Sequence, residues 1–244
     1  GGSATNDAGI GMLQALGIKF LDKNQNDIGI GAQYIKDIVD FDISSLDKRL
    51  KDIKFKVACD VNNVLCGKQG ATYVFGPQKG LKQKQVESLD THLLNFALLC
   101  EKKFNRKTKI IKGCGAAGGL GFGLITFLNA SLLSGIDIVL NRVNLDIHLN
   151  DADLVITGEG KMDAQTLNGK VPIGVARRAN KKNIKVIAIC GALESGYEVL
   201  YDHGITAVFD TVPKVDSLDN ILKNASSNIS GSSQNIARVL NLSL

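Results

Sequence analysis

The segment at residues 154–170, LVITGEGKMDAQTLNGK, places glycines and charged residues directly after a run that is typical of a buried strand. The first four residues suit a parallel strand covered on both faces, and the glycines that follow predict a turn whose backbone N–H groups point outward. Because open α/β folds bind ligands at the carboxyl edge of the sheet, we expect the charged side chains to meet a ligand there. The residues concerned are Gly158, Glu159, Gly160, Lys161 and Asp163.

Glycine is the second unusual feature of the sequence. The 244 residues include 26 glycines, which is more than the average of about 7%, and they gather in short segments. Each segment mixes glycine with Ser, Thr, Asn, Asp or Lys, which is the chemistry of loops that hold oxyanions through backbone N–H groups and helix N-termini. The segments are residues 1–7, 67–80, 113–123 and 158–169.

Helices and strands that would position these loops alternate along the chain. Apolar spacing predicts helices at 7–16, 84–103 and 119–133 and short strands at 57–60, 71–75, 154–157, 185–190 and 207–211. From residue 153 onward, strands and helices alternate and two helices end the chain. Ser217 is a good N-cap for the first of these helices, and Gly231 predicts a break before the second. The order predicts a mixed α/β domain at residues 1–150 and a βαβαβα unit at residues 151–244.

Composition restricts the class of protein. A hydrophobic content of 44% with 22% charged residues is typical of a globular chain. No apolar run approaches the ~18 residues of a membrane helix and no signal pattern is present, so we expect a cytoplasmic protein without a membrane partner. The net charge of +5 is spread out and aromatic content is 5%, which argues against a nucleic-acid partner and favours anionic small substrates. The five cysteines lack CxxC spacing, and we expect reduced, mostly buried thiols.

The sequence GCGAAG at residues 113–118 fits the GxGxxG pattern of dinucleotide-binding loops, and Asp137 follows near the spacing of a ribose-binding acid. Two features argue against NAD binding. The apolar run before the glycines is very short, and Asp137 opens an expected strand at 138–140 instead of closing one. Tight helix packing or a substrate loop explains the glycines as well. No P-loop surrounds Lys170, and the histidines lack metal-binding spacing.

Five segments in a fixed order carry a more specific pattern: GGSATNDAGIGMLQALG, VACDVNNVLCG, GATYVFGPQKG, GCGAAGGLGFG and LVITGEGKMDAQTLNGKVPIGVA. Together they resemble the motifs of the bacterial-type glycerate kinase family. The resemblance implies transfer of the γ-phosphoryl group of ATP to a hydroxyl of glycerate, with Mg²⁺. It also implies an α/β fold in which a Rossmann-like parallel-sheet domain carries an inserted α/β domain. Residues 1–150 would be the inserted domain, and residues 151–244 would be the C-terminal part of the Rossmann-like domain.

The resemblance also shows two departures from the family pattern. Members of the family begin with a further segment, whereas this chain begins at GGSATND, so we expect the N-terminal strands of the Rossmann-like domain to be missing. A homodimer or a complementing N-terminal polypeptide would then be a partner. Ala8 stands where the family usually has glycine, and we expect it to crowd a turn that needs a positive φ.

The chemistry of phosphoryl transfer indicates which residues would take part. It needs N–H donors and a cation around the phosphoryl group, carboxylates for a metal ion, and a base or orienting group for the hydroxyl. We expect phosphate and substrate to be bound by Gly1, Gly2, Ser3, Thr5, Lys79, Gly158, Glu159 and Gly160. The expected catalytic residues are Asp163, Asp7 and Lys161, and the expected Mg²⁺ ligands are Asp60 and Asp163.

Each of these roles has a structural alternative. Asp7 would only start a helix, Lys79 would be a solvated turn lysine, and Glu159 would form a local ion pair with Lys161. For the whole chain, one alternative is a catalytically inactive fragment that binds small organic anions. The other is a nicotinamide-dependent oxidoreductase, which rests on GCGAAG alone.

Overall fold

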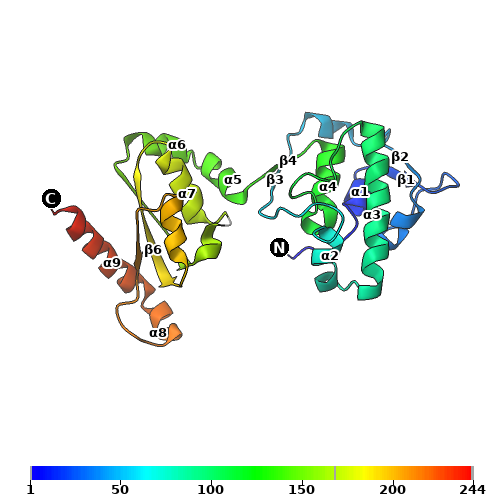
Figure 1. The fold of residues 1–244 in the computed structure, drawn as a ribbon. Helices are drawn as coiled ribbons and strands as arrows, with labels where there is room; N and C mark the ends of the chain where they lie inside the picture. Colours follow the sequence, from blue (N-terminus) through cyan, green and yellow to red (C-terminus); the bar gives the residue numbers. More distant parts are fainter. Residues whose placement is uncertain (1, 168, 243–244) are drawn as a thin grey trace. The chain divides into compact units, whose positions relative to one another are not determined.

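The computed structural model describes residues 2–167 and 169–242 and forms two compact units, Gly1–Leu133 and Ser134–Leu244 (Figure 1). Both units combine helices with strands, and parallel strand pairs occur in each. The α/β class predicted from the sequence is therefore confirmed. Within the described ranges, no helix is both long and apolar enough to cross a membrane.

Helices form most of the first unit. Two small sheets accompany them, one from the antiparallel pair β1–β2 and one from the parallel pair β3–β4. The elements are α1 (Ile10–Ala15), β1 (Lys19–Leu21), η1 (Ala32–Asp37), β2 (Asp40–Asp42), η2 (Lys48–Asp52), β3 (Lys56–Ala58), α2 (Ala71–Phe75), η3 (Pro77–Lys79), α3 (Gln83–Phe104), α4 (Ala116–Leu128) and β4 (Ser131–Leu133), where η denotes a 3₁₀ helix.

A cluster of phenylalanine rings holds the first unit together. Phe20 of β1 lies with its ring centroid 5.5 Å from that of Phe96 on α3 and 6.0 Å from that of Phe127 on α4. Aromatic pairs at such distances contribute about 0.5–1.5 kcal/mol beyond the burial of their area. The cluster fixes both long helices to one core, so the loops at their ends are carried by a rigid scaffold.

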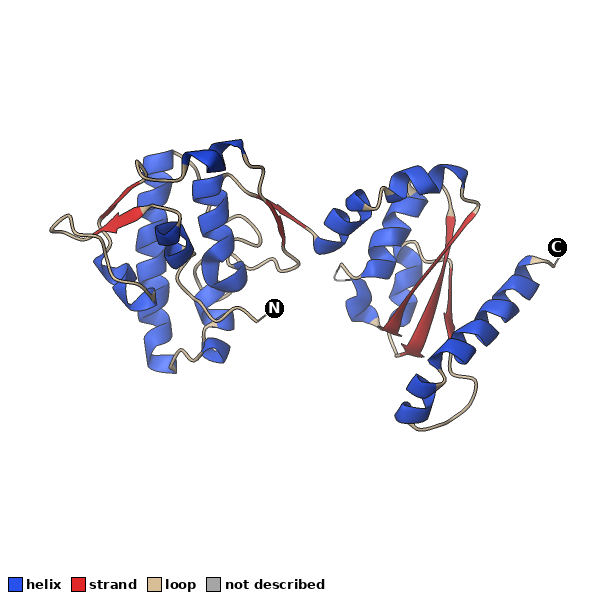
Figure 2. Cartoon of the chain, turned by 180° about the vertical axis from the view of Figure 1, so that it is seen from behind, coloured by secondary structure: helices blue, strands red, loops and turns tan. Residues whose placement is uncertain are grey.

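The second unit is built on a parallel sheet in the order β5-β6-β7 (Figure 2). Helix α7 packs on β5 and β6, and Val186, Ala188 and Cys190 of β6 are fully buried. The elements are α5 (Gly135–Arg142), α6 (Leu145–His148), η4 (Leu149–Asp151), β5 (Leu154–Met162), η5 (Ala164–Leu167), α7 (Val171–Asn180), β6 (Lys185–Leu193), η6 (Tyr197–His203), β7 (Ala207–Asp210), α8 (Leu218–Lys223) and α9 (Ala225–Leu240).

The two units divide earlier than the sequence analysis placed the domain boundary. Residues 134–150 belong to the second unit because their helices pack against α7. Arg178 of α7 forms ion pairs with Asp137 of α5 and Asp146 of α6. That the units are an inserted domain and the C-terminal part of a Rossmann-like domain stays a prediction.

Three elements of the sequence analysis differ from the structure. Residues 71–75, an expected strand, form helix α2, in which Ala71 and Thr72 are buried and the helix packs against α3 and α4. The expected strand at 138–140 lies inside α5, and the helix expected over 119–133 ends at Leu128. In the two expected strands, packing against neighbouring helices outweighs the β-preference of branched residues. The third difference arises because Asn129 adopts a left-handed conformation and ends α4.

Strand β5 continues through the glycines that were expected to end it. Gly158 pairs with Ile189 of β6, and a Cβ at Gly158 would lie 2.4 Å from the carbonyl oxygen of Ile189. Gly158 therefore permits a close strand contact, and the turn predicted at these glycines is wrong. Ser217 caps α8 as predicted, since its Oγ accepts a hydrogen bond from the backbone N–H of Asn220 at 3.4 Å. Gly231 lies inside α9, so the predicted break at this residue is also wrong.

Candidate active site

The first candidate cluster lies where the N-terminal loop meets η3. Lys79 Nζ donates hydrogen bonds to Ser3 Oγ at 3.0 Å and to the carbonyl oxygen of Thr5 at 2.8 Å. Gly80, which follows Lys79, has a φ of 91° and ends η3. The structure therefore brings together two of the glycine-containing loops from which site residues were predicted.

Asp7 is a structural cap as well as a neighbour of this cluster. Its side chain is buried and accepts hydrogen bonds from the backbone N–H groups of Gly9 and Gly11, both at 3.0 Å. Burial lowers the pKa of Lys79, and the negative charge of Asp7 acts in the opposite direction. The alternative that Asp7 starts the first helix is therefore seen in the structure, and its catalytic role stays a prediction.

The glycines at residues 113–123 allow the N-terminal loop, at residues 5–8, to lie directly against α4. A Cβ at Gly118 would lie 2.0 Å from the carbonyl oxygen of Thr5, and one at Gly119 would lie 2.8 Å from Cα of Ala8. The backbone N–H of Ala8 donates to the carbonyl oxygen of Gly118 at 3.0 Å. Tight packing, one of the two explanations left open for this run, is therefore what the structure contains. Ala8 has a φ of 55°, which confirms that its position needs the left-handed region.

A cavity of about 630 Å³ lies beside Lys79. It is bordered by the N-terminal loop, η1, η3 and α3, and its described lining residues include lysines and a histidine but no acidic residue. Positive charge without a carboxylate in the lining favours an anionic ligand. The polar lining residues are Asn6, Gln33, Lys36, Lys79, Lys84, Gln85, Ser88 and His92.

Asn6 lines this cavity and also carries an unsatisfied buried acceptor. Its Nδ2 donates to Thr72 Oγ1 at 3.2 Å, but its Oδ1 is buried without a hydrogen-bond partner among the described residues. An unpaired buried acceptor costs about 1–3 kcal/mol.

The second candidate cluster lies at the carboxyl end of β5. Lys161 Nζ lies 3.3 Å from Asp163 Oδ2 and 3.2 Å from Glu194 Oε1. These carboxylates, Glu194 first, raise the pKa of Lys161. Desolvation is the largest influence on Asp163, yet the opposing hydrogen bonds from Lys161 and the backbone N–H of Gln165 leave its pKa lowered. Asp163 is therefore ionised at neutral pH, which makes it a weak base but a suitable neighbour for a cation.

Glu159 is part of the same cluster but does not pair with Lys161. Its Oε1 accepts hydrogen bonds from Thr166 Oγ1 and Lys170 Nζ, each at 3.1 Å. Lys170 is the N-cap residue of α7, which returns to β5 after η5. The chain reversal supplies a different lysine partner from the one that the sequence spacing suggested.

Comparison with known proteins agrees with the motifs. The profile described as the Glycerate kinase family matches residues 1–241. The chain belongs to the glycerate kinase family. It is 49% identical to "Glycerate kinase" of Haemophilus influenzae, covering 98% of this chain and 64% of the relative, and 48% identical to "Glycerate 2-kinase" of Escherichia coli, covering 98% and 63%.

A solved glycerate kinase structure is also similar. The "putative glycerate kinase 2" of Salmonella typhimurium LT2 matches with a TM-score of 0.83 and 46% identity, over 98% of this chain and 62% of that chain. The chain thus spans less than two thirds of the length of the relatives named here.

The remaining site residues expected from the glycerate kinase motifs are placed as follows. Asp60 lies in an exposed loop after β3, in the first unit, whereas Asp163 is in the second. Gly2 has a φ of 84°, and Gly1 lies outside the described residues. Among those residues, no three or more His, Cys, Asp or Glu side chains are grouped as a metal site. That Asp60 and Asp163 are Mg²⁺ ligands stays a prediction.

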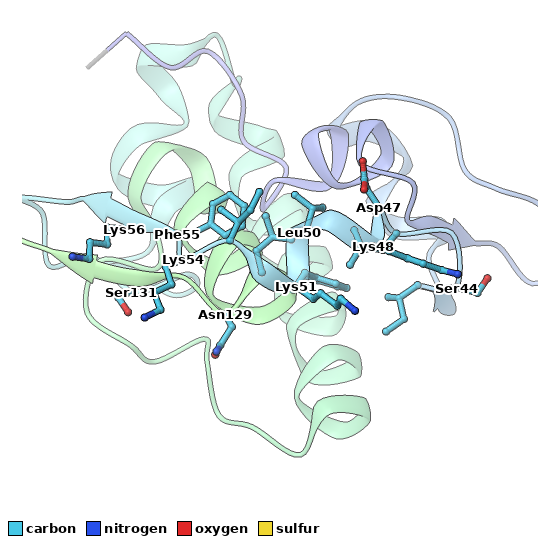
Figure 3. Close-up of a pocket in the computed structure, with 15 residues that line it drawn as sticks. Ser44, Asp47, Lys48, Leu50, Lys51, Lys54, Phe55, Lys56, Asn129 and Ser131 are labelled. Atoms are coloured by element: carbon cyan, nitrogen blue, oxygen red, sulfur yellow. The ribbon is translucent and has the colours of Figure 1, made fainter.

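A second basic cavity of the first unit, also about 630 Å³, contains none of these residues (Figure 3). Figure 3 shows lysines from η2, from the segment after it and from the start of β3 around it, with Phe55 and Leu50 between them. Its acidic lining residue, Asp47, forms an ion pair with Arg49. Because no glycerate kinase motif contributes to this cavity, we place the candidate acceptor site at Lys79 instead.

Sequence reasoning missed several members of the two clusters. Lys170 and Thr166 belong to the same motif as Asp163, but Lys170 was considered only as a P-loop lysine. Asn6 lies inside the GGSATND motif, whose other polar residues were predicted as site residues, so its position in the motif was the available signal. His92 lies in the middle of α3, and no sequence motif marks it as a site residue. It lines the cavity because η3 packs near α3 in the folded chain.

Proposed function

We propose that the protein is a glycerate kinase, which transfers the γ-phosphoryl group of ATP to a hydroxyl of glycerate. Membership of the family and the names of the similar proteins support this activity. The observation that carries it in this chain is the contact of Lys79 with the GGSATND loop beside a cavity whose described lining has no acidic residue. That arrangement fits a small acid that carries hydroxyl groups.

In this proposal the cavity of the first unit binds glycerate. The Lys79 ammonium binds an anionic oxygen of the substrate, in a charge-assisted hydrogen bond. Asn6, Ser88 and His92 line the same cavity and are polar partners for a glycerate hydroxyl. Gly2, Ser3 and Thr5 supply polar groups of the adjacent loop. The substrate is thus held at both its carboxylate and its hydroxyl end, as discrimination against simpler acids requires.

The cluster of the second unit serves the phosphates in this proposal. Lys161 and Lys170 supply positive charge for phosphate oxygens, and Asp163 is an ionised carboxylate beside them. Phosphoryl-transfer sites hold Mg²⁺ with one or two carboxylates plus phosphate oxygens, and Asp163 fits that requirement as one ligand. The ion would neutralise developing charge on the phosphates. Asp163, with its lowered pKa, holds and orients charge and does not act as a strong base.

The activity is tested by ADP formation from ATP, D-glycerate and Mg²⁺ in a coupled assay. We expect Asp163→Asn to lower kcat by about two orders of magnitude or more, as removal of a transition-state contact does. Glu194→Gln is the matched control, because it also removes a carboxylate partner of Lys161, and we expect it to change kcat less than about threefold. Equal turnover of Asp163→Asn and the unmodified protein would remove Asp163 from the mechanism. Glycerate binding without any turnover would support an organic-anion-binding protein.

The similar protein of Escherichia coli is named a 2-kinase, and we infer the 2-hydroxyl as the acceptor here. ³¹P NMR of the product distinguishes 2-phosphoglycerate from 3-phosphoglycerate. The five free cysteines fit a reducing compartment such as the cytoplasm. A homodimer or a complementing polypeptide stays a prediction from the sequence, and light scattering of the active protein tests it.

A further inference from the structure

We propose that an apolar slot in the second unit binds the adenine ring of ATP. The slot has a volume of about 410 Å³ and lies between β5–β6 and the helices α8 and α9. Figures 1 and 2 show α8 and the start of α9 beside the ends of the strand arrows, which is the edge where open α/β sheets bind ligands. The inference rests on the proposed kinase function, since that function supplies the nucleotide.

Glycines give the slot a flat floor. Gly158 and Gly160 of β5 and Gly191 of β6 line it. A Cβ at Gly160 would meet no atom within 4 Å, and the φ of this residue is not positive. Its backbone therefore does not require glycine, and the absence of a side chain is what the position contributes. A strip of strand without side chains accepts the face of a planar ring.

Apolar side chains form the roof of the slot. On the side opposite the strands, the slot is lined by Ile221 and Leu222 of α8 and by Ala225 and Ile229 of α9. Leu222 is 64% exposed and Ile229 is 49% exposed. A ring inserted beneath them would remove apolar surface from water on both of its faces, which is favourable by about 25 cal/mol per Å².

Two polar residues, Glu159 and Thr211, belong to the lining, and Thr211 makes an adenine ring the best-matched occupant. Thr211, which is nearly buried, lines the slot and carries a hydroxyl that can pair with a ring nitrogen or the exocyclic amine of adenine. Glu159, the charged residue of the lining, has its Oε1 paired with Thr166 Oγ1 and Lys170 Nζ, so its negative charge is compensated. A mostly apolar pocket with few polar groups is typical of sites for rings of this size.

The test fills the slot without disturbing the fold. Ala225→Leu enlarges a side chain that lines the slot, and Gly231→Ala adds a side chain on α9 outside the slot, where a Cβ meets no atom within 4 Å. Isothermal titration calorimetry measures the affinity of each protein for ADP and for tripolyphosphate, which lacks the base. We expect Ala225→Leu to weaken ADP binding by about tenfold or more, because the ring can no longer be buried. We expect tripolyphosphate binding to stay unchanged, and Gly231→Ala to leave both affinities unchanged.

The outcomes separate this inference from the proposed function. Unchanged ADP affinity in Ala225→Leu, at an unchanged melting temperature, would overturn the adenine slot. Equal loss of ADP and tripolyphosphate binding would also overturn it, because the substitution would then act on the phosphates. ADP formation by the unmodified protein, measured in parallel, reports on the kinase activity itself. If the protein forms ADP but the slot variant binds ADP normally, only the adenine slot is refuted. If the unmodified protein neither turns over nor binds ADP, both the slot and the kinase function are refuted.

Discussion

Replacing Lys79 with methionine removes the ammonium group that joins η3 to the N-terminal loop while keeping most of the aliphatic stem. In the structure this group donates to Ser3 Oγ and to the carbonyl oxygen of Thr5 at 3.0 and 2.8 Å. A hydrogen bond to a charged group contributes about 1.5–3 kcal/mol. Loss of one such bond to the substrate anion corresponds to an affinity lower by about 10- to 150-fold.

We expect this loss to appear in KM for glycerate and not in kcat. The substrate anion that Lys79 holds is bound equally before and during phosphoryl transfer, and removal of such uniform binding raises KM with little change in kcat. The coupled ADP assay over a range of glycerate concentrations measures both constants. KM for ATP should change little, since Lys79 is assigned to the acceptor.

Lys82→Met is the matched control for this experiment. Lys82 is an exposed lysine three residues further along the chain, it does not line the cavity beside Lys79, and its loss changes the net charge equally. We expect it to alter KM for glycerate less than about threefold, as an exposed charge does. A KM that stays the same in Lys79→Met, with an unchanged melting temperature, would refute the assignment of the acceptor site. Equal increases in both variants would show a general effect of charge.

Three further predictions concern pH, packing and the thiols. Burial lowers the pKa of Lys79, so glycerate affinity should be highest below that pKa and fall as the pH rises through it. The fall should begin at a lower pH than the ~10.4 of an ordinary lysine would give. In a profile of KM against pH, Lys79→Arg should abolish this alkaline loss of affinity. Gly118→Ala should lower the free energy of unfolding, measured by urea denaturation, by at least about 2 kcal/mol. The reason is that Gly118 has a φ of 71° and a Cβ there would overlap backbone atoms. A Cβ at Gly67 meets no atom within 4 Å, so Gly67→Ala should cost only the backbone strain of about 1–2 kcal/mol. Burial raises the pKa of Cys66 to about 12 and that of Cys190 to about 11, so mass spectrometry after iodoacetamide treatment near pH ~8 should find both unmodified in the folded protein; rapid alkylation would contradict the packing around them.

Long elements with a clear periodicity were predictable from the sequence. The helix expected at 84–103 is α3, Gln83–Phe104, because its apolar residues repeat over many turns and one face is buried. The strands at the start of β5, β6 and β7 were predictable for a related reason: each begins with a continuous apolar run that is typical of a parallel sheet.

Short elements were not predictable in the same way. Residues 71–75 contain branched and aromatic residues that favour a strand, yet they form a helix between α3 and α4. The glycines of β5 look like a turn in the sequence, but β6 lies so close at Gly158 that only glycine fits there. In both cases the deciding contact comes from a segment that is distant in the chain, so the local sequence pattern cannot predict it.

The sequence by itself determined the chemical content of the candidate site: glycine loops for oxyanions, Lys79 and Lys161 for negative charge, and Asp163 as a carboxylate. Only the tertiary structure decided which of these groups meet. Lys79 reaches a loop more than seventy positions earlier in the chain, and the glycines at 113–123 allow that loop to lie against α4. The physical reason is that residue types fix which bonds a side chain can form, whereas packing of the whole core fixes which partner comes within bonding distance.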